Sequence, residues 1–292
     1  MKNKDIVDAI LNYHPKLIAY NGCDGYKSGN PEDECTGVAV ALVPTAEVIE
    51  KAAAKNCNLI ITHEPIFYQT PDFDCWKGSF NNRVYDEKKK LLEKYNMTVW
   101  RDHDHMHANV PDSIFSGVIK ELGWEQYAIK PKKGDAMACF VFEMPKTPIE
   151  DIADHLKRTL KLNGLKYMGN KDNKVKKVAL VGHLFPNGFG QDGIKEDGFY
   201  HDYAMEIMKA MEEQGVELII PGEIVEWTVL AYIRDGIAMG KNMSCISIGH
   251  FNLEELGMKD FAKVVDGLVN KGDTTEKINV EYIPTEDGFM YL

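Results

Sequence analysis

Three short segments of the chain carry histidine and acidic side chains of the types that bind divalent metal ions. In the densest, RDHDHMHAN, the imidazoles of His103, His105 and His107 occupy alternate positions with aspartates between them, and imidazole is the commonest protein ligand for metals near neutral pH. An extended segment would place the three imidazoles on one face, whereas a helical turn would bring His103 and His107 together as an i, i+4 pair. The alternative is a histidine-rich surface loop without a metal.

The other two segments each combine one histidine with one glutamate. In ITHEPIF, an apolar stretch runs directly into His63 and Glu64, which point in different directions and so suit two neighbouring ions, or one ion and its water. In GHFNLEE, Glu254 follows His250 by four residues at the start of a predicted helix, which puts both on one helical face. The alternatives are a capped turn with a surface glutamate and a helix cap with an incidental histidine.

Apolar runs of strand length alternate with segments of helical periodicity, a pattern typical of an α/β fold with largely parallel sheets. The predicted strands cover residues 37–43, 58–62, 97–100, 138–143, 175–181, 217–220, 243–249 and 278–283. The predicted helices cover residues 1–15, 45–55, 85–95, 111–122, 149–162, 200–214, 223–236 and 253–270. Each metal-capable segment follows a predicted strand, and the carboxyl ends of parallel strands gather at one sheet edge. We therefore expect the stretches around positions 63, 105 and 252 to meet in one pocket.

A connection that contains lysines, a proline and a glycine, at residues 128–135, predicts a boundary between two α/β domains. We expect a metal-site domain at residues 1–127, completed by residues 245–292, and a second domain at residues 128–244. The metal site is expected at the strand carboxyl edge between them.

Composition and charge exclude several classes of protein. The 292 residues include 34 Lys and Arg against 45 Asp and Glu, for a formal charge of -11, which would repel a nucleic-acid backbone. We find no signal-peptide pattern and no apolar run long enough for a membrane span. The six cysteines are scattered without a C-x-x-C pair, which favours reduced thiols and a cytoplasmic location.

Together, ITHEP, VWRDHDHMH and GHFNLEE resemble the NGG-one-interacting-factor-three-like family, also called GTP cyclohydrolase type-two homologues or dinuclear-metal-centre proteins. The motifs align without gaps and cover nearly the whole chain. The resemblance implies two α/β domains, two divalent metal ions and a toroidal homohexamer. The residues it implies as metal ligands are His63, Glu64, His103, His107, His250 and Glu254.

Two of these positions depart from the family pattern, because Glu64 replaces a histidine and His107 replaces an aspartate. Our hypothesis is that Glu64 takes over the anionic or bridging role lost at position 107, since a carboxylate can bridge two ions roughly 3.5–4 Å apart and a neutral imidazole offers one lone pair. The family's usual W-D-x-x-G-L near the start is replaced here by NGCDGYKSG.

Two further segments hold weaker candidates. PGEIVEWTV places Glu223 and Glu226 ahead of a predicted helix, where acidic residues are common in a first turn. VGHLFPNGFGQDG contains His183 but matches neither a Walker loop nor a dinucleotide fingerprint, and we interpret it as a turn.

The sequence thus predicts a dinuclear metal hydrolase that acts on a small molecule, with zinc, iron or manganese as the metal. Glu64 or His105 is expected to move protons. One alternative is a metal-binding scaffold or regulatory protein without turnover, whose metal site would be closed by protein ligands, and another is a protein that stores or delivers metal.

Overall fold

The computed structural model describes residues 1–69, 77–132, 135–184, 192–271 and 277–292. The chain forms two compact units, each built around a five-stranded mixed sheet. Unit 1 comprises Met1–Val118 and Glu254–Glu286, and unit 2 comprises Ile119–Leu253 and Asp287–Leu292. The α/β class predicted from the sequence is confirmed.

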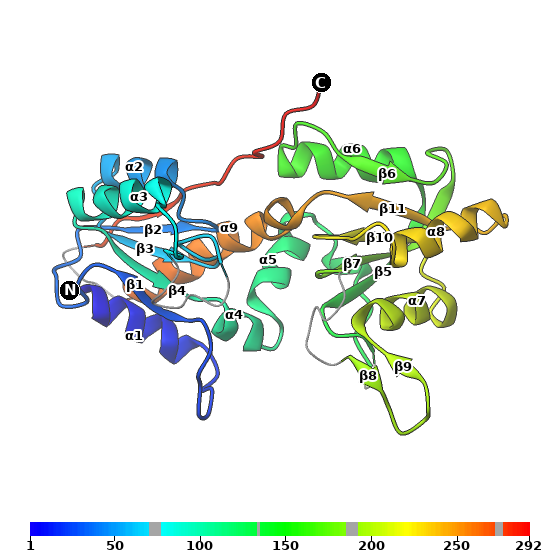
Figure 1. Ribbon diagram of the computed structural model, residues 1–292, viewed down its shortest axis with the longest axis horizontal. Coiled ribbons are helices and arrows are strands. Elements are labelled where there is room, and N and C mark those ends of the chain that lie inside the picture. Colours follow the sequence, from blue (N-terminus) through cyan, green and yellow to red (C-terminus); the bar gives the residue numbers. More distant parts are fainter. Residues whose placement is uncertain (70–76, 133–134, 185–191, 272–276) are drawn as a thin grey trace. The chain divides into compact units, whose positions relative to one another are not determined.

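The sheet of unit 1 has the strand order β1-β4-β3-β2-β12. Its strands are β1 (Gly25–Ser28), β2 (Val38–Ala41), β3 (Leu59–Thr62), β4 (Thr98–Arg101) and β12 (Val280–Tyr282). Four of them run parallel, and β1 pairs antiparallel with β4 at the edge. The strands VAVA, LIIT and TVWR are buried along their whole length, because helices cover both faces of the sheet (Figure 1).

The helices that begin in unit 1 are α1 (Asn3–Tyr13), α2 (Ala46–Ala54), α3 (Arg83–Lys94), α4 (Asp104–Ala108) and α5 (Ser113–Glu121). Helices α2 and α3 pack on one face of the sheet in a core that includes Ile49, Ile60 and Leu92. Helix α2 begins where the sequence predicts, because the Thr45 side chain accepts a hydrogen bond from the Val48 backbone amide at 3.2 Å.

The sheet of unit 2 has the order β5-β7-β10-β11-β6. Its strands are β5 (Cys139–Pro148), β6 (Lys166–Met168), β7 (Lys174–Val181), β10 (Leu218–Pro221) and β11 (Ser244–Ser247). The three central strands are parallel, and the two edge strands are antiparallel to their neighbours. A separate hairpin pairs β8 (Gly193–Ile194) with β9 (Tyr200–His201).

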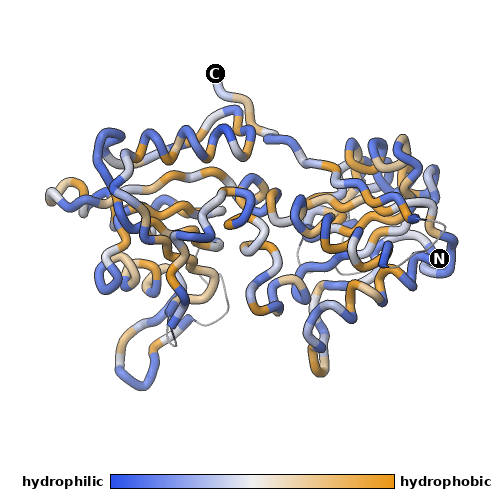
Figure 2. Tube along the Cα trace, turned by 180° about the vertical axis from the view of Figure 1, so that it is seen from behind, coloured by the Kyte–Doolittle hydropathy of each residue, from blue (hydrophilic) through white to orange (hydrophobic). Residues whose placement is uncertain are grey.

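The remaining helices are η1 (Glu125–Tyr127), α6 (Ile149–Leu160), α7 (Tyr203–Glu213), α8 (Val229–Ala238) and α9 (His250–Val269). Helices α7 and α8 cover one face of the second sheet, with Ile207 and Ile233 in its core. Figure 2 shows hydrophobic residues along the strands of each sheet and alternating hydrophobic and hydrophilic turns along the helices. Within the described residues, no helix is long and apolar enough to cross a membrane.

Several predicted helix starts are wrong, among them those of α5, α8 and α9. Helix α5 begins at Ser113 rather than at Pro111, because Asp112 caps it by accepting from the Phe115 amide at 2.9 Å. Helix α8 begins at Val229 rather than at residue 223, because the chain after β10 first pairs with the segment that follows β7. Helix α9 begins at His250 rather than at residue 253.

Candidate metal centre

Three imidazoles converge at the carboxyl ends of β3 and β4 in unit 1. His63 directly follows β3, His103 lies two residues after β4, and His107 lies on α4. Their ligand nitrogens lie within 4.8 Å of one another, and the ring centroids are 4.4 Å apart for His63 and His103 and 4.8 Å apart for His103 and His107. This is the spacing expected for side chains that share one metal ion.

Each of these rings is oriented through its Nδ1 atom. Nδ1 of His63 lies 3.2 Å from the backbone oxygen of Asp102, that of His103 lies 2.8 Å from Oδ1 of Asp104, and that of His107 lies 2.7 Å from Oδ2 of Asp112. An oxygen acceptor at Nδ1 fixes the proton there and leaves Nε2 as the metal ligand. The three rings therefore have the orientation found in imidazole metal sites.

The histidine segment turns rather than extends, which decides between the two alternatives left by the sequence. Asp24 holds the turn, because its Oδ1 accepts from the backbone amides of His103 and Asp104 at 2.7 and 3.0 Å. Its Oδ2 accepts from the amide of His105 at 2.9 Å. These bonds satisfy the free amides at the start of α4, so that His103 and His107 meet at i, i+4 spacing.

Two buried carboxylates complete the group. Glu64, Glu254 and His63 also offer ligand atoms within 4.8 Å of one another, and Nε2 of His63 lies 3.5 Å from Oε2 of Glu254. The exposed fractions are 0% for His63, 6% for Glu64 and 1% for Glu254. Because His63 belongs to both groups, five of the six predicted ligands come together in unit 1, although their binding of metal stays a prediction.

Acidic side chains act on His107 within this group. Burial is the largest single effect on the pKa of His107 and lowers it, but the hydrogen bond to Asp112 and the charges of Asp112, Glu254 and Glu64 together outweigh burial and raise the pKa of His107 above its ordinary value. The same acidic groups would favour the binding of divalent cations beside His107.

His105 lies in a different group from the three converging imidazoles. Its Nδ1 is 2.7 Å from Oδ2 of Asp24, and it forms a separate metal-capable group with Asp24 and Asp102. The carboxylate of Asp102 is in turn 2.9 Å from Nε2 of the buried His14. The proton-moving role expected of His105 stays a prediction, and its position favours support of α4.

Comparison with known proteins decides the family. The family model described as Duf34/NIF3 (NGG1p interacting factor 3) matches residues 1–196 of the chain. The chain belongs to this family. The resemblance stated from the three motifs is thereby confirmed.

Relatives of this Duf34/NIF3 protein span most of its length. A protein of Clostridium acetobutylicum named GTP cyclohydrolase 1 type 2 homolog is 27% identical over 277 residues, which cover 93% of this chain and 92% of the relative. A protein of the same name from Clostridium perfringens is 28% identical over 261 residues, 87% of each chain.

Solved structures share the fold. Staphylococcus aureus protein SA1388 has a TM-score of 0.69 at 19% identity, with 100% of this chain and 99% of that chain covered. Reduced HcgD from Methanocaldococcus jannaschii has a TM-score of 0.61 at 18% identity, with 97% of each chain covered. At these identities the likeness shows the fold alone.

The sixth predicted ligand, His250, lies in unit 2. It opens α9, the helix that also carries Glu254. Together with His183 and Glu223 it forms a metal-capable group. The assignment of His250 to the centre in unit 1 stays a prediction from the sequence motif. Residues 185–191 of the glycine-rich segment after His183 lie outside the described part of the chain.

The residues that orient the ligands are harder to find from the sequence than the ligands themselves. Asp112 carried a signal, because an aspartate just ahead of a helical pattern is a typical cap. Asp24 lies in NGCDGYKSG, the segment that replaces a family motif, but nothing in its spacing connects it with residues 103–105. A contact across about 80 positions has no local signature.

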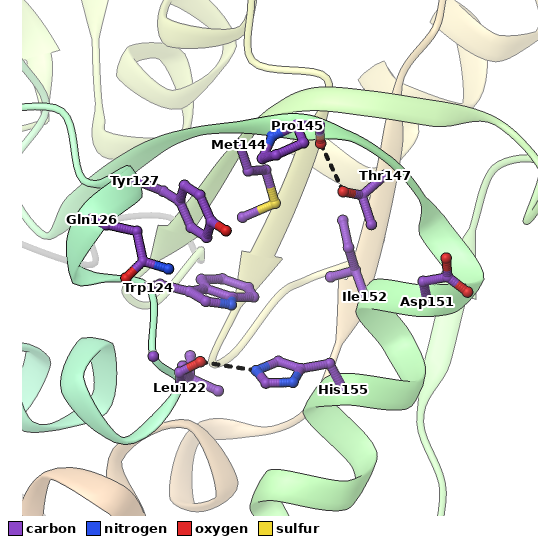
Figure 3. Close-up of a pocket in the computed structure, with 11 residues that line it drawn as sticks. Leu122, Trp124, Gln126, Tyr127, Met144, Pro145, Thr147, Asp151, Ile152 and His155 are labelled. Carbon is purple, nitrogen blue, oxygen red and sulfur yellow. Dashed lines mark hydrogen bonds between the residues drawn. The ribbon is translucent and has the colours of Figure 1, made fainter.

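Unit 2 also contains a pocket of about 300 Å³ between η1, β5 and α6 (Figure 3). Trp124 and Tyr127 form part of its wall, and the rings of Trp124 and His155 are stacked at 6.0 Å. Nε2 of His155 is 2.9 Å from the backbone oxygen of Leu122. Because neither His155 nor Asp151 in this wall belongs to a metal-capable group of the described residues, the pocket is not a candidate for the metal centre.

Proposed function

We propose that this protein binds two divalent metal ions in unit 1 and uses them to hydrolyse a small molecule. The observation that carries the proposal is the convergence of three Nδ1-anchored imidazoles with two buried glutamates. Mixed imidazole and carboxylate ligands suit zinc, iron and manganese alike. When bound, the two ions would lower the pKa of a water molecule and stabilise negative charge that develops on the substrate.

The five donors fit two ions better than one. His63 has a single ligand nitrogen, because its Nδ1 faces the backbone oxygen of Asp102. An ion held by the three imidazoles therefore leaves Glu64 and Glu254 available for a neighbouring ion, with either carboxylate able to bridge. This arrangement supports the hypothesis that Glu64 supplies the anionic ligand that His107 does not.

The exposure of the ligands supports an open site. The side chains of His103 and His107 are 27% and 28% exposed, while His63, Glu64 and Glu254 are buried. Solvent can therefore reach one side of the group, as a hydrolytic site requires, whereas a purely structural site is closed by protein ligands. In this proposal one carboxylate oxygen of Glu64 binds the second ion, and the other oxygen is the base that accepts a proton from water.

We propose the substrate class from the name of the relatives. The name of the two Clostridium relatives points to GTP ring opening, which is a hydrolysis at a purine ring. We therefore place nucleotides first among the candidate substrates, ahead of phosphoesters and cyclic amides. From the same resemblance we propose that the protein forms a homohexamer and is located in the cytoplasm. Light scattering on the purified protein would test the oligomeric state.

The test is reconstitution of the metal-free protein with zinc, iron(II) or manganese, each followed by a screen for hydrolysis of these three compound classes. We expect turnover with at least one metal at two ions per unit 1, and its loss in His103→Ala. Two bound ions without turnover of any of the three compound classes would instead favour a scaffold or regulatory protein.

A further inference from the structure

The pocket of unit 2 is lined by side chains from three segments, with aromatic rings on one side (Figure 3). Trp124 and Tyr127 come from the η1 segment, Met144 from β5, and Ile152 and His155 from α6. Its volume of about 300 Å³ lies at the lower end of the range for sites that hold small molecules. We propose that this pocket binds a planar nitrogen heterocycle, such as a nucleobase or its nucleoside, and does so without a metal ion.

The aromatic wall is held in place by the protein itself. The ring of Trp124 meets that of the fully buried Phe142 edge-on, with centroids 5.3 Å apart, and is stacked with His155 at 6.0 Å. His155 is fixed in turn, because its Nε2 lies 2.9 Å from the backbone oxygen of Leu122. The amide of Tyr127 donates to the backbone oxygen of Trp124 at 3.0 Å. A wall that is already ordered lowers the cost of binding a ligand.

The indole N–H of Trp124 is a donor without a hydrogen-bond partner in the part of the chain that the structure describes. Only 6% of the residue is exposed, yet its Nε1 is not among the described side-chain atoms that are sealed from solvent. Because Trp124 lines the pocket, the N–H opens onto this space. An unpaired donor in a largely buried residue is costly, and a ring nitrogen or carbonyl oxygen of a heterocycle would pair with it.

The shape of the wall favours a flat ring with a polar edge. Figure 3 shows the rings of Trp124 and Tyr127 projecting from the same segment toward α6, so that a flat ring can stack on them. Stacking of a base on an aromatic side chain is favourable for every base. The side chain of Gln126 also lines the pocket, and an amide can both donate to and accept from the edge of a heterocycle.

The charge of the wall narrows the ligand class further. Among the described lining residues there is no lysine or arginine, so the wall offers no cation to a phosphate group. An alkylammonium ion could pack on the aromatic rings, but it carries no acceptor for the N–H of Trp124. A neutral heterocycle with both acceptor and donor groups meets the two conditions.

The test is titration calorimetry of the full chain with adenosine, guanosine and cytidine, before and after loading with zinc. We expect at least one of the three to bind with a dissociation constant below about 1 mM, and with equal affinity in the two forms of the protein. Tryptophan fluorescence should fall as the base stacks on Trp124. No binding of any of the three at about 1 mM, or binding that requires zinc, would refute the proposal.

Two variants of the wall separate its contributions. Trp124→Phe keeps a ring against Phe142 and removes the N–H, so the affinity should fall about 2–10-fold and the fluorescence change should disappear. Tyr127→Ala removes a stacking face and should weaken binding at least about 5-fold. Because Tyr127 is only partly buried, this second variant is the safer for folding, which circular dichroism checks in both.

Trp227→Phe and Tyr167→Ala are the matched controls, because both residues belong to unit 2, lie outside the pocket wall and are 69% and 50% exposed. Both controls should bind the nucleosides as the wild type does. Wild-type affinity in both wall variants, or equal weakening in a wall variant and its control, would overturn the proposal. A nucleoside 5′-monophosphate that bound at least about 10-fold more tightly than its nucleoside would also overturn it, because a cationic site would then hold the probe.

Discussion

Oδ2 of Asp112 lies 2.7 Å from Nδ1 of His107, while Oδ1 of the same carboxylate accepts from the Phe115 amide at 2.9 Å. One side chain thus caps α5 and orients a candidate metal ligand. The helix cap and the ligand are coupled, so that a change at Asp112 affects both stability and metal affinity.

Asp112→Ala should therefore have two separate effects. Loss of the cap should lower the free energy of unfolding by about 1 kcal/mol, and loss of the Nδ1 acceptor should weaken metal binding about 10–100-fold. Urea unfolding of the metal-free protein and zinc titration against a chromophoric chelator measure the two effects.

Asp202→Ala is the control for this experiment, because Asp202 caps α7 by accepting from the Met205 amide at 2.7 Å and belongs to no metal-capable group of the described residues. It should lose similar stability and keep its metal affinity. Equal metal affinities in the two variants would show that Asp112 acts only as a cap.

Glu64→Gln tests whether a carboxylate at this position holds the second ion. The substitution keeps the shape of a buried side chain and removes its charge, so we expect one ion to be lost or bound at least about 10-fold more weakly. Metal counting and titration calorimetry would report it. Two ions bound at wild-type affinity would contradict the compensation hypothesis.

Helices α5 and α9 approach each other through glycines, which predicts opposite effects for two alanine substitutions in α9. A Cβ atom at Gly257 would lie 2.6 Å from the backbone oxygen of Ile114, whereas one at Gly267 would meet nothing within 4 Å. Gly257→Ala should lower the free energy of unfolding by about 1–3 kcal/mol through overpacking. It should also weaken metal binding, since Glu254 lies one turn earlier on α9.

Gly267→Ala should raise stability by about 0.5–1 kcal/mol, because alanine favours a helix over glycine, and it should leave metal binding unchanged. Thermal unfolding of both variants provides the comparison. If both alanines proved stabilising, the close contact of the two helices would be wrong.

The buried cysteines should resist alkylation. Burial raises the pKa of the thiols of Cys35 and Cys57 to about 11, and that of Cys139 and Cys245 to about 12. Since the thiolate is the reactive form and these pKa values lie well above pH 8, only about one thiol in a thousand or fewer is ionised there. Modification by iodoacetamide should be slow in the folded protein and should quicken as the pH rises.

In guanidinium the same thiols regain their ordinary pKa near 8.5 and should react within minutes to hours, in line with their thiolate fraction. Peptide mass spectrometry over a time course measures each site. Rapid labelling of Cys245 in the folded protein would show that its environment is not the buried one described.

The helices, the strands and the types of candidate ligand can be predicted from the sequence more accurately than the orientation of the ligand side chains. Periodicity predicts α2 and β3 to within one residue, because capping and burial act locally. Periodicity does not decide the conformation of the histidine segment, since the same spacing fits a strand and a turn, and the choice depends on Asp24, about 80 residues away. It also fails to predict the start of α8, because backbone pairing of Ile224 with Leu184 outweighs the local helical pattern.

The candidate metal centre depends on Asp24 as well as on its ligands. A fragment that began at residue 25 would keep all five candidate ligands of unit 1, yet the amides that open α4 would lose the carboxylate that gathers them. Metal would then have to organise the loop as it bound, at the expense of affinity. Transplanting this centre into another scaffold would for the same reason require the Asp24 segment along with the ligands.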